Sequence, residues 1–314
     1  MTMATDKNLP KKIAVLMGGP GSERDVSLAT GRGVSKALHS LGAEVLDVDV
    51  HDENFALPKD VDLAFITIHG TFGEDGQLQK ILEERGVCYT GDGVEASRAA
   101  FDKIFSKEKF REHNVVTPEW EVVEVGQRPT ISVPLVVKPA RQGSTVGVVI
   151  VKNASELDSA ITEAGRYDRK LLIEKFVPGR ELTIGVLGDQ ALPILEIIPK
   201  GGFYDFNNKY PFLNPQGGGG AEHVCPAEID PTRTKQIQEQ ALRAFRALGL
   251  VVYGRVDVLL SDSGEPFVLE VNTIPGMTEA SLLPEAAAAA GINYVDLCAR
   301  IIALSRGKMQ RSPR

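Results

Sequence analysis

The sequence predicts an α/β protein that begins with a doubly wound parallel sheet and continues into a mixed α+β region. Over the first hundred residues, short apolar runs alternate with segments of helical periodicity, a pattern typical of parallel strands joined by helices. The C-terminal third contains a long helix followed by a predicted β-hairpin. The chain has 314 residues, of which 43% are hydrophobic and 25% charged. This length and composition predict a globular protein of two or three domains.

The elements are predicted in chain order from apolar periodicity and from the residues that flank each run. The N-terminal part is predicted to contain strand 13–17, helix 26–41, strand 43–50, strand 61–68, helix 77–85 and a single helix 97–113. The middle part is predicted to contain strand 135–138, strand 148–151, a helix capped by Ser155 with Asp158 three residues on, and strand 171–177. The last part is predicted to contain strands 182–187 and 192–198, an irregular stretch 201–226, helix 231–248, the hairpin and an alanine-rich helix.

Composition excludes several classes of function. The net charge is −7 with both signs interspersed, so neither a nucleic-acid-binding patch nor a basic membrane surface is expected. No run approaches the roughly 20 apolar residues of a membrane helix, and the first apolar run is too short for the core of a signal peptide. Cys88, Cys225 and Cys298 are odd in number and lack metal-binding spacing. Reduced thiols and a cytoplasmic location are expected.

The predicted hairpin near the C-terminus brings four polar side chains together. Its strands contain Gly254-Arg255-Val256-Asp257 and Glu270-Val271-Asn272, and a two-residue turn at Ser263-Gly264 connects them. This turn places Asp257 opposite Glu270 and Arg255 opposite Asn272, all on one face. The opposite face would hold only apolar residues: Val256, Val258, Leu260, Phe267, Leu269 and Val271.

Two facing carboxylates repel each other unless a cation lies between them. Asp257, Glu270 and the amide oxygen of Asn272 form a set of hard oxygen donors that suits Mg²⁺ or Mn²⁺. Arg255 beside this set could hold an anionic reacting group. The alternative is a solvated hairpin face with mixed charges, but the apolar reverse face favours the metal site.

A second candidate site lies at the end of the strand 135–138. Lys138 is followed by Pro139 and by a loop rich in Gly, Ser and Thr that contains Gly143 and Ser144. Backbone N–H groups of such a loop can bind phosphate oxygens while the ammonium neutralises charge. The sequence has no GxxxxGK[ST] motif, so this is not a Walker A loop. A solvent-facing lysine before a flexible turn is the alternative.

The N-terminal loops offer two further candidates. Gly18-Gly19-Pro20-Gly21-Ser22-Glu23-Arg24 occupies the position of a dinucleotide-binding fingerprint, with Asp47 or Asp49 as the ribose-binding acid, but Arg24 replaces the third glycine. We interpret this loop instead as presenting Glu23 to a substrate cation. A tight turn that places Glu23 near a helix N-terminus is the alternative. His69 ends a predicted strand beside a glycine-rich loop, where open α/β sheets bind ligands.

The segment from Glu174 to Glu181 is a possible hinge between two strands. An exposed connection of this kind can offer backbone groups to an adenine edge, and Glu181 could bind ribose hydroxyls. An ordinary charged hairpin is the alternative.

Together these runs resemble the D-alanine–D-alanine ligases of the ATP-grasp superfamily, from about residue 13 to residue 304. The motifs that carry the resemblance are Gly18-Gly19 to Glu23-Arg24-Asp25-Val26-Ser27, His69-Gly70, Gly73-Glu74-Asp75-Gly76, Tyr89-Thr90-Gly91, Asp102-Lys103, Val137-Lys138-Pro139, Gly143-Ser144, Glu174-Lys175, Phe203-Tyr204-Asp205, Lys209-Tyr210, Cys225-Pro226-Ala227, Gly254-Arg255-Val256-Asp257, Glu270-Val271-Asn272-Thr273, Pro275-Gly276-Met277-Thr278 and Ser281-Leu282. The resemblance implies an ATP-grasp architecture with three domains: an N-terminal Rossmann-like substrate domain (1–99), a central small domain (100–184) and a C-terminal domain with the metal and substrate site (185–314).

The resemblance also implies a role for each candidate residue. The ATP-binding residues would be Lys103, Lys138, Ser144, Glu174, Lys175, Val177, Glu181 and Lys209. Asp257, Glu270 and Asn272 would bind two Mg²⁺ or Mn²⁺ ions. Glu23 and His69 would bind the first D-alanine, and Ser281, Leu282 and Lys209 the carboxylate of the second or nearby phosphate charge. Arg255 and the N–H of Gly276 would stabilise the oxyanion, and Glu23, Ser144 and Tyr210 would form a linked triad.

The activity implied is ATP-dependent synthesis of D-alanyl-D-alanine through a D-alanyl phosphate, for peptidoglycan precursors, and the family implies a homodimer. Tyr210 favours a dipeptide product over a D-lactate ester, whereas the stretch 210–225 is longer than is usual in the family. Another carboxylate–amine pair, a non-catalytic nucleotide-binding protein and NAD-dependent redox chemistry are the alternatives.

Overall fold

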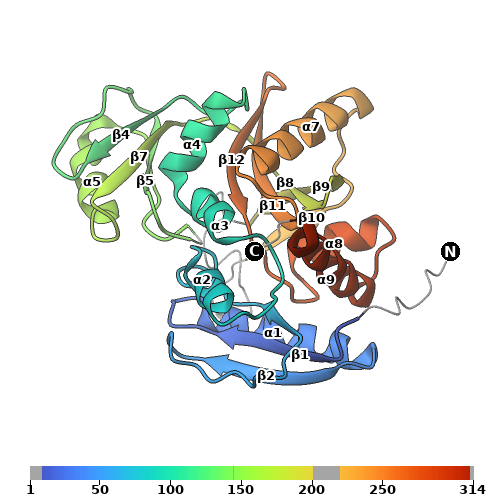
Figure 1. Cartoon of the computed structure of the whole chain (residues 1–314). Coiled ribbons are helices and arrows are strands. Elements are labelled where there is room, and N and C mark those ends of the chain that lie inside the picture. Colours follow the sequence, from blue (N-terminus) through green and yellow to red (C-terminus); the bar gives the residue numbers. More distant parts are fainter. Residues whose placement is uncertain (1–8, 144, 201–219, 312–314) are drawn as a thin grey trace.

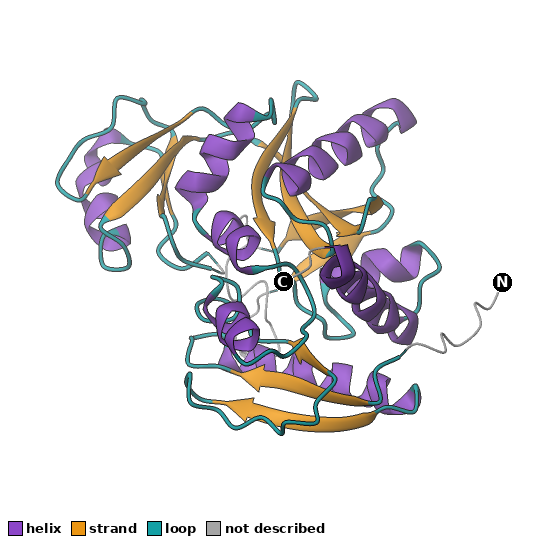
Figure 2. Cartoon of the chain, viewed as in Figure 1, coloured by secondary structure: helices purple, strands orange, loops and turns teal. Residues whose placement is uncertain are grey.

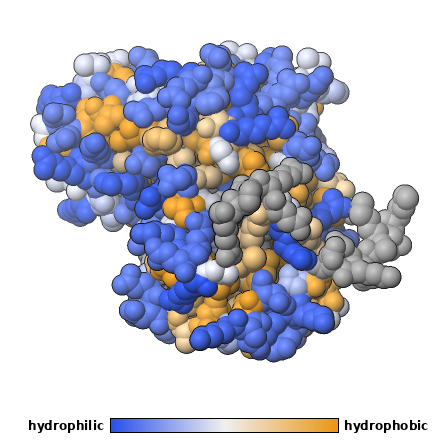
Figure 3. Space-filling model, viewed as in Figure 1, coloured by the Kyte–Doolittle hydropathy of each residue, from blue (hydrophilic) through white to orange (hydrophobic). Residues whose placement is uncertain are grey.

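The computed structural model describes residues 9–143, 145–200 and 220–311. Three β-sheets with their helices form the described part of the chain (Figures 1 and 2). The N-terminal sheet forms the lower part of the view, and the two other sheets lie side by side above it. Hydrophilic side chains predominate on the visible face of the molecule (Figure 3).

The N-terminal sheet is parallel, in the order β2-β1-β3. Its strands are β1 (Lys12–Gly18), β2 (Glu44–Val50) and β3 (Leu63–Ile66), and its helices are α1 (Arg24–Ser40) and α2 (Gln77–Glu84). Strand β1 lies in the middle and is almost entirely buried, which explains its unbroken apolar run. The parallel sheet predicted from the alternation of strands and helices is therefore confirmed.

The helix predicted over 97–113 is two helices, so the prediction of one helix is wrong. They are α3 (Val94–Phe101) and α4 (Lys103–Glu112). Asp102 separates them: its backbone is extended, and its carboxylate accepts hydrogen bonds from the N–H groups of Ile104 and Phe105, at 3.0 and 3.1 Å. An aspartate in this role caps a new helix, and Lys103 becomes the first residue of α4.

The second sheet is antiparallel, in the order β4-β7-β5-β6. It consists of β4 (Trp120–Glu124), β5 (Leu135–Pro139), β6 (Val149–Val151) and β7 (Lys170–Lys175), with the 3₁₀ turn η1 (Ala154–Glu156) and helix α5 (Leu157–Ala164). Strand β4 was not predicted. The cap predicted at Ser155 is also wrong, because Asn153 and Glu156 form the capping box two residues earlier.

The third sheet has five antiparallel strands in the order β10-β9-β8-β11-β12. Its elements are β8 (Gly179–Leu187), β9 (Gln190–Pro199), β10 (Ala221–Val224), β11 (Tyr253–Ser261) and β12 (Pro266–Asn272), with helices α7 (Pro231–Ala247) and α8 (Leu282–Ala289). Alternate side chains of β9 face the two helices: Ile194 packs in the cluster with Phe245 of α7, and Leu195 packs with Leu282 of α8. The two helices thus cover opposite faces of the sheet.

The hairpin of β11 and β12 has the predicted pairing at its polar end. Asp257 lies opposite Glu270 and Arg255 opposite Asn272. A β-bulge follows, however, because Val258 pairs with Val268 and leaves Leu269 as an extra residue. The bulge shifts the alternation by one, so Val268 is buried whereas Phe267 and Leu269 are only half-buried. Their predicted place on the buried face is therefore wrong.

The last two helices of the chain pack against the N-terminal sheet. The alanine-rich segment continues into a second helix, α9 (Tyr294–Arg311), which the sequence patterns did not separate from α8. One hydrophobic cluster contains Ile13 of β1, Leu283 of α8 and Ile301 of α9, so α8 and α9 attach the third sheet to the first. Within the described ranges no single helix is long and apolar enough to span a membrane. Helices α8 and α9 together have the length and apolar composition of a span, but they are bent at 102° to each other.

The predicted boundary between residues 184 and 185 falls inside β8. The three-domain division at residues 99 and 184 stays a prediction.

Candidate active site

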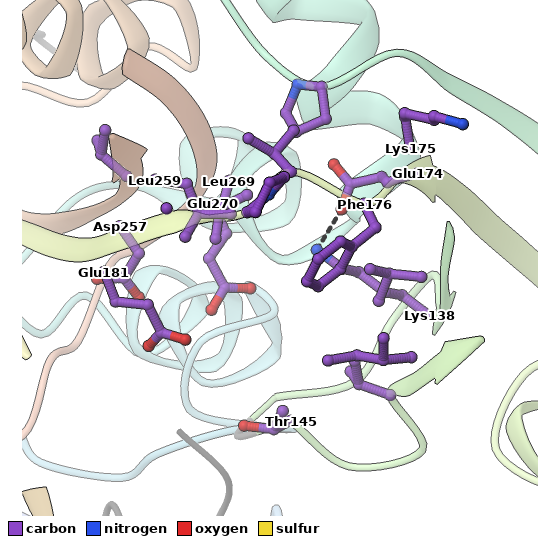
Figure 4. A pocket seen from close by; sticks show the side chains of 18 of the residues that line it. Lys138, Thr145, Glu174, Lys175, Phe176, Glu181, Asp257, Leu259, Leu269 and Glu270 are labelled. Carbon is purple, nitrogen blue, oxygen red and sulfur yellow. Dashed lines mark ion pairs between the residues drawn. The ribbon is translucent and has the colours of Figure 1, made fainter. Parts of the chain in front are cut away.

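A cavity of about 280 Å³ lies between the second and third sheets. Residues from both sheets line it, among them Lys138 of β5, Glu174 of β7, Glu181 of β8 and the facing pair Asp257 and Glu270. Figure 4 shows the carboxylates of Glu181, Asp257 and Glu270 directed toward one region of the cavity, with the ammonium of Lys138 across from them. Carboxylate and ammonium groups therefore both border the cavity.

Glu174 is buried between two lysines. Its carboxylate forms ion pairs with Lys138 and with Lys107 of α4 (Figure 4 marks the pair with Lys138). Burial by itself would raise the pKa of Glu174, but the two ammonium groups outweigh burial and lower it. Glu174 is therefore a charged group that holds Lys138 at the edge of the cavity.

Lys103 connects the glycine-rich loop to the hairpin. As the first residue of α4, it donates from Nζ to the carbonyl of Gln142 at 2.7 Å and lies 3.3 Å from Oε2 of Glu270. Its position depends on Asp102, because the cap of Asp102 fixes where α4 begins. The ammonium thus reaches the cavity beside the predicted phosphate loop.

Hydrogen-bond donors from three strands converge on Asp257. Arg255 binds it through two hydrogen bonds of 2.9 Å, Thr183 of β8 donates at 2.6 Å, and the amide of Asn272 donates at 3.1 Å. The bidentate arrangement fixes the guanidinium plane of Arg255 beside the cavity. Register explains the convergence, because Thr183 and Glu270 lie opposite Asp257 on the two neighbouring strands.

The three predicted metal ligands fit a divalent ion by their chemistry. Two carboxylates and an amide oxygen on adjacent strands are hard oxygen donors, which Mg²⁺ and Mn²⁺ prefer. Among the residues described, no three His, Cys, Asp or Glu side chains gather as a metal-binding group. A set with only two carboxylates is consistent with this, since Mg²⁺ usually completes its coordination with water and substrate phosphates.

Glu23 lies between the first sheet and the glycine-rich loop. Its side chain is buried, and its Oε2 is so close to two glycines that an added Cβ would lie 2.5 Å away at Gly70 and 3.2 Å away at Gly143. Only glycine leaves room for the carboxylate at Gly70, where φ is also +67°. The structure therefore brings Glu23 next to the loop that contains Ser144, as the predicted triad requires, although Ser144 and Tyr210 lie outside the described residues.

Asp49, one of the two candidate acids of the dinucleotide interpretation, is bound by Arg24. Arg24 binds Asp49 at 2.7 Å and also donates to the carbonyl of Val50 at 3.2 Å. Asp49 therefore anchors the start of α1 and is engaged by a cation, which makes it a poor partner for ribose hydroxyls. Glu23 directly precedes α1, as the alternative of a helix N-terminus expects, so its presentation to a substrate cation stays a prediction.

His69 is buried and joins the first sheet to the loop after β12. Its Nδ1 is 2.9 Å from the carbonyl of Ile274, and its Nε2 is 3.1 Å from the hydroxyl of Thr30. Burial lowers the pKa of His69, but the hydrogen bond and charge of Glu74 and the charge of Glu23 outweigh burial and raise it. His69 thus lies in one cluster of titratable groups with Glu23 and Glu74.

The loop before α8 brings Gly276 against Ser281. A Cβ on Gly276 would lie 2.9 Å from Oγ of Ser281. The Ser281 hydroxyl accepts the N–H of Thr278 at 3.0 Å and lies 2.7 Å from the Thr278 hydroxyl. Ser281 precedes α8 and Leu282 is its first residue, so both lie at a helix N-terminus, where backbone N–H groups favour an anion.

The predicted adenine segment borders the same cavity. Lys175 and Val177 are among the lining residues. The ammonium of Lys175, however, donates to the carbonyl of Ser132 at 3.0 Å, and in Figure 4 it points away from the cavity. Only the backbone and stem of Lys175 are therefore placed to contact a ligand there. Lys209, the remaining predicted ATP ligand, lies outside the described residues.

The sequence patterns missed three polar residues of the site: Lys107, Glu74 and Thr183. Lys107 lies four residues after Lys103, on the same face of α4, so the i, i+4 spacing was a usable signal. Glu74 lies within a glycine-rich motif that was noted without a role for it. Thr183 could be found only from the pairing of β8 with β11.

Comparisons with known proteins show what this chain is similar to. A sequence model of a family described as "D-ala D-ala ligase C-terminus" matches residues 103–303. A D-alanine–D-alanine ligase from Methylacidiphilum infernorum is 47% identical over 95% of this chain and 96% of its own length. A crystal structure of D-alanine–D-alanine ligase from Bacillus anthracis complexed with ATP has a TM-score of 0.84 at 32% identity and covers 96% of this chain and 100% of that one. The VanG D-Ala:D-Ser ligase of Enterococcus faecalis has a TM-score of 0.82 at 27% identity, with coverages of 95% and 100%.

Proposed function

The chain belongs to the D-alanine–D-alanine ligase family, and we propose that it joins two D-alanine molecules to D-alanyl-D-alanine at the expense of ATP, for peptidoglycan precursors. It is an ATP-dependent ligase with an ATP-grasp fold. The observation that carries the proposal is the cavity between the second and third sheets, where lysines face the Asp257–Glu270 pair. This arrangement suits a polyphosphate and a carboxylate that must approach each other.

The nucleotide would lie between the two sheets. Lys103 and Lys138 are placed to neutralise phosphate charge, and the N–H groups of the glycine-rich loop would bind phosphate oxygens. The segment from Glu174 to Val177 would border adenine, and Glu181 the ribose hydroxyls. A carboxylate nucleophile is repelled by the phosphates of ATP, so cationic side chains at this position lower the barrier by electrostatic stabilisation.

The two amino acids would bind toward the first sheet and α8. Glu23 supplies a buried carboxylate for the ammonium of the first D-alanine, and its charge helps to raise the pKa of His69. The carboxylate of this D-alanine attacks the terminal phosphate of ATP and forms D-alanyl phosphate and ADP. The amine of the second D-alanine then attacks the acyl carbon and phosphate leaves. Arg255 and the N–H of Gly276 would stabilise the tetrahedral oxyanion, and Ser281 and Leu282 would hold the second carboxylate.

We also propose that Asp257, Glu270 and Asn272 bind two Mg²⁺ or Mn²⁺ ions together with ATP. The hard oxygen donors on adjacent strands support this proposal. When bound, such ions supply positive charge to the phosphates. In the chain itself Arg255 compensates the charge of Asp257, and the amide of Asn272 donates to the same carboxylate.

The deciding experiment measures phosphate released from ATP by the protein under three conditions. These are D-alanine alone, L-alanine alone, and D-lactate together with D-alanine. We expect release that depends on D-alanine, with D-alanyl-D-alanine as the product by mass spectrometry. Release only with other acids would replace the proposal with a different carboxylate–amine ligase. A D-serine or D-lactate product in competition with D-alanine would change the second substrate; one structural neighbour is a D-Ala:D-Ser ligase. ATP binding without turnover would support a non-catalytic role, and NADH binding would support redox chemistry.

We propose the cytoplasm as the location and a homodimer as the assembly. Cys88, Cys225 and Cys298 are free thiols, which suits a reducing compartment. Membership of the family supports the dimer. Light scattering of the purified protein measures its mass, and a monomer at working concentration would contradict the dimer.

A further inference from the structure

Lys107 is a buried cation whose partners come from three different elements. Its side chain is 1% exposed, and its ammonium forms an ion pair with Glu174 of β7 and a hydrogen bond with the hydroxyl of Thr117, which precedes β4. The carbonyl of Val268 in β12 lies 3.4 Å away and also accepts from Thr117 at 2.7 Å. Helix α4 thus meets the second and third sheets at one ammonium group.

The placement of Lys107 matters because Glu174 is shared. One carboxylate oxygen of Glu174 faces Lys107 and the other faces Lys138, which reaches the cavity. A buried carboxylate with two cationic partners leaves part of each positive charge uncompensated. With only one partner, the carboxylate would bind that partner more strongly and compensate its charge fully. The charge that Lys138 presents to a phosphate therefore depends on Lys107.

We propose that Lys107 is a positioning residue for ATP binding: it holds Glu174 from behind, so that Lys138 stays extended into the cavity with charge available for phosphate. Lys107 itself is behind Glu174 and absent from the cavity lining. Its contact with Val268 also ties β12, which carries Glu270, to the strand that carries Glu174. This inference rests on the proposed nucleotide site.

The test is a double-mutant cycle in the full-length protein. Equilibrium dialysis or calorimetry measures the Kd for ATP with Mg²⁺ for wild type, Lys107→Met, Lys138→Met and the double variant. We expect Lys107→Met to raise the Kd about tenfold, the effect of removing one charged partner. The double variant should bind ATP no more weakly than Lys138→Met, since residues that act through each other are not additive.

Lys109→Met is the matched control, because Lys109 lies on the same helix, forms an ion pair with Glu112 at the surface and lies over the ring of Phe105. It should leave the Kd unchanged. Urea unfolding of each variant separates a loss of stability from a loss of affinity. If Lys107→Met does not fold, Lys107→Gln, which keeps a hydrogen-bond donor without the charge, takes its place in the cycle.

The inference is overturned if the folded Lys107 variant binds ATP like wild type, or if the losses in the double variant multiply. In both cases wild-type ATP binding leaves the proposed function intact. If wild type itself does not bind ATP, the proposed nucleotide site fails and this inference fails with it.

Discussion

Glu270 is the carboxylate of the hairpin that pairs with Lys103. It lies opposite Asp257 on the neighbouring strand and 3.3 Å from the ammonium of Lys103. An anion at this position attracts Lys103 and would attract the ions that we propose.

Glu270→Gln should reduce turnover by about 100-fold or more, because the amide keeps the shape but removes a charge from the proposed metal site. Steady-state phosphate release measures the effect. The unfolding midpoint in urea should change little, since the side chain is only half-buried. Glu265→Gln on the exposed turn of the same hairpin is the control. Near-normal turnover of Glu270→Gln would refute the metal-binding role.

The buried ammonium of Lys107 predicts a second effect, on stability at alkaline pH. Burial is the main reason that its pKa falls to about 8, although Glu174 opposes burial. The ordinary value for lysine is 10.5, so between pH 8 and 10.5 the unfolded chain binds more protons at this residue than the folded chain does. Stability contributed by this group therefore rises with pH over that window.

The measurement is the free energy of unfolding in urea for wild type and Lys107→Met from pH 7 to 10.5. Wild type should gain stability relative to the variant above pH 8. A constant difference between the two proteins would contradict the lowered pKa.

Residue types and strand ends were enough to predict Lys138, Asp257, Glu270 and Arg255, because each follows or interrupts an apolar strand. Lys107 could not be predicted in this way. A lysine in a polar helix is usually exposed, and only the packing of α4 against both sheets buries this one.

At the scale of elements, the hairpin has the predicted pairing of Asp257 with Glu270, although its loop differs from the predicted turn. The loop has three residues, because Ser261 accepts the N–H of Gly264 and donates its own N–H to Glu265, with Gly264 at φ +82°. The two-residue turn predicted at Ser263-Gly264 is therefore wrong. The extra residue at Leu269 compensates for the different loop, and Asp257 still meets Glu270. Local sequence patterns do not reveal such a bulge, because it is set by pairing across strands.

The break between α3 and α4 predicts the next outcome. Asp102→Ala removes the carboxylate that accepts from Ile104 and Phe105, which should cost about 1 kcal/mol of stability. It should also raise the Kd for ATP, because the first turn of α4 holds Lys103. Urea unfolding and equilibrium dialysis measure the two effects.

Asp102→Asn, which retains a capping oxygen, is the control and should restore most of the affinity. Equal losses for the alanine and asparagine variants would show that Asp102 acts by its charge and not as a cap.

At the scale of the whole molecule, the site depends on contacts between distant parts of the chain. Glu23 lies against Gly143, 120 positions later, and His69 against Ile274. Local patterns identified these residues as candidates, and only the resemblance to a family grouped them. Periodicity could predict the three sheets in outline but not their arrangement around the cavity, since sheets pack through side chains whose partners are far apart in sequence.

A buried carboxylate that does not line the cavity lies at one junction between these parts. Asp92, in the loop before α3, accepts the N–H groups of Val251 and Val252 at 2.9 and 3.2 Å, just before β11. Lys308 of α9 donates to the neighbouring carbonyl of Gly91 at 2.8 Å. The loop thus attaches the first sheet both to the third sheet and to the C-terminal helix.

This junction predicts a pH dependence of stability in acid. Burial raises the pKa of Asp92 to about 6, against the opposing effects of its hydrogen bonds and of Lys308, from an ordinary value of 3.8. Between these values the folded chain binds more protons at Asp92 than the unfolded chain, so this group's contribution to stability falls as pH rises from about 4 to about 6.

In Asp92→Asn the contribution is absent. Urea unfolding from pH 4 to 7 should therefore show wild type losing stability relative to Asp92→Asn up to pH 6. Asp189→Asn, at an exposed turn, should run parallel to wild type. If Asp92→Asn also runs parallel, the carboxylate at this junction is charged throughout, and its hydrogen bonds outweigh burial.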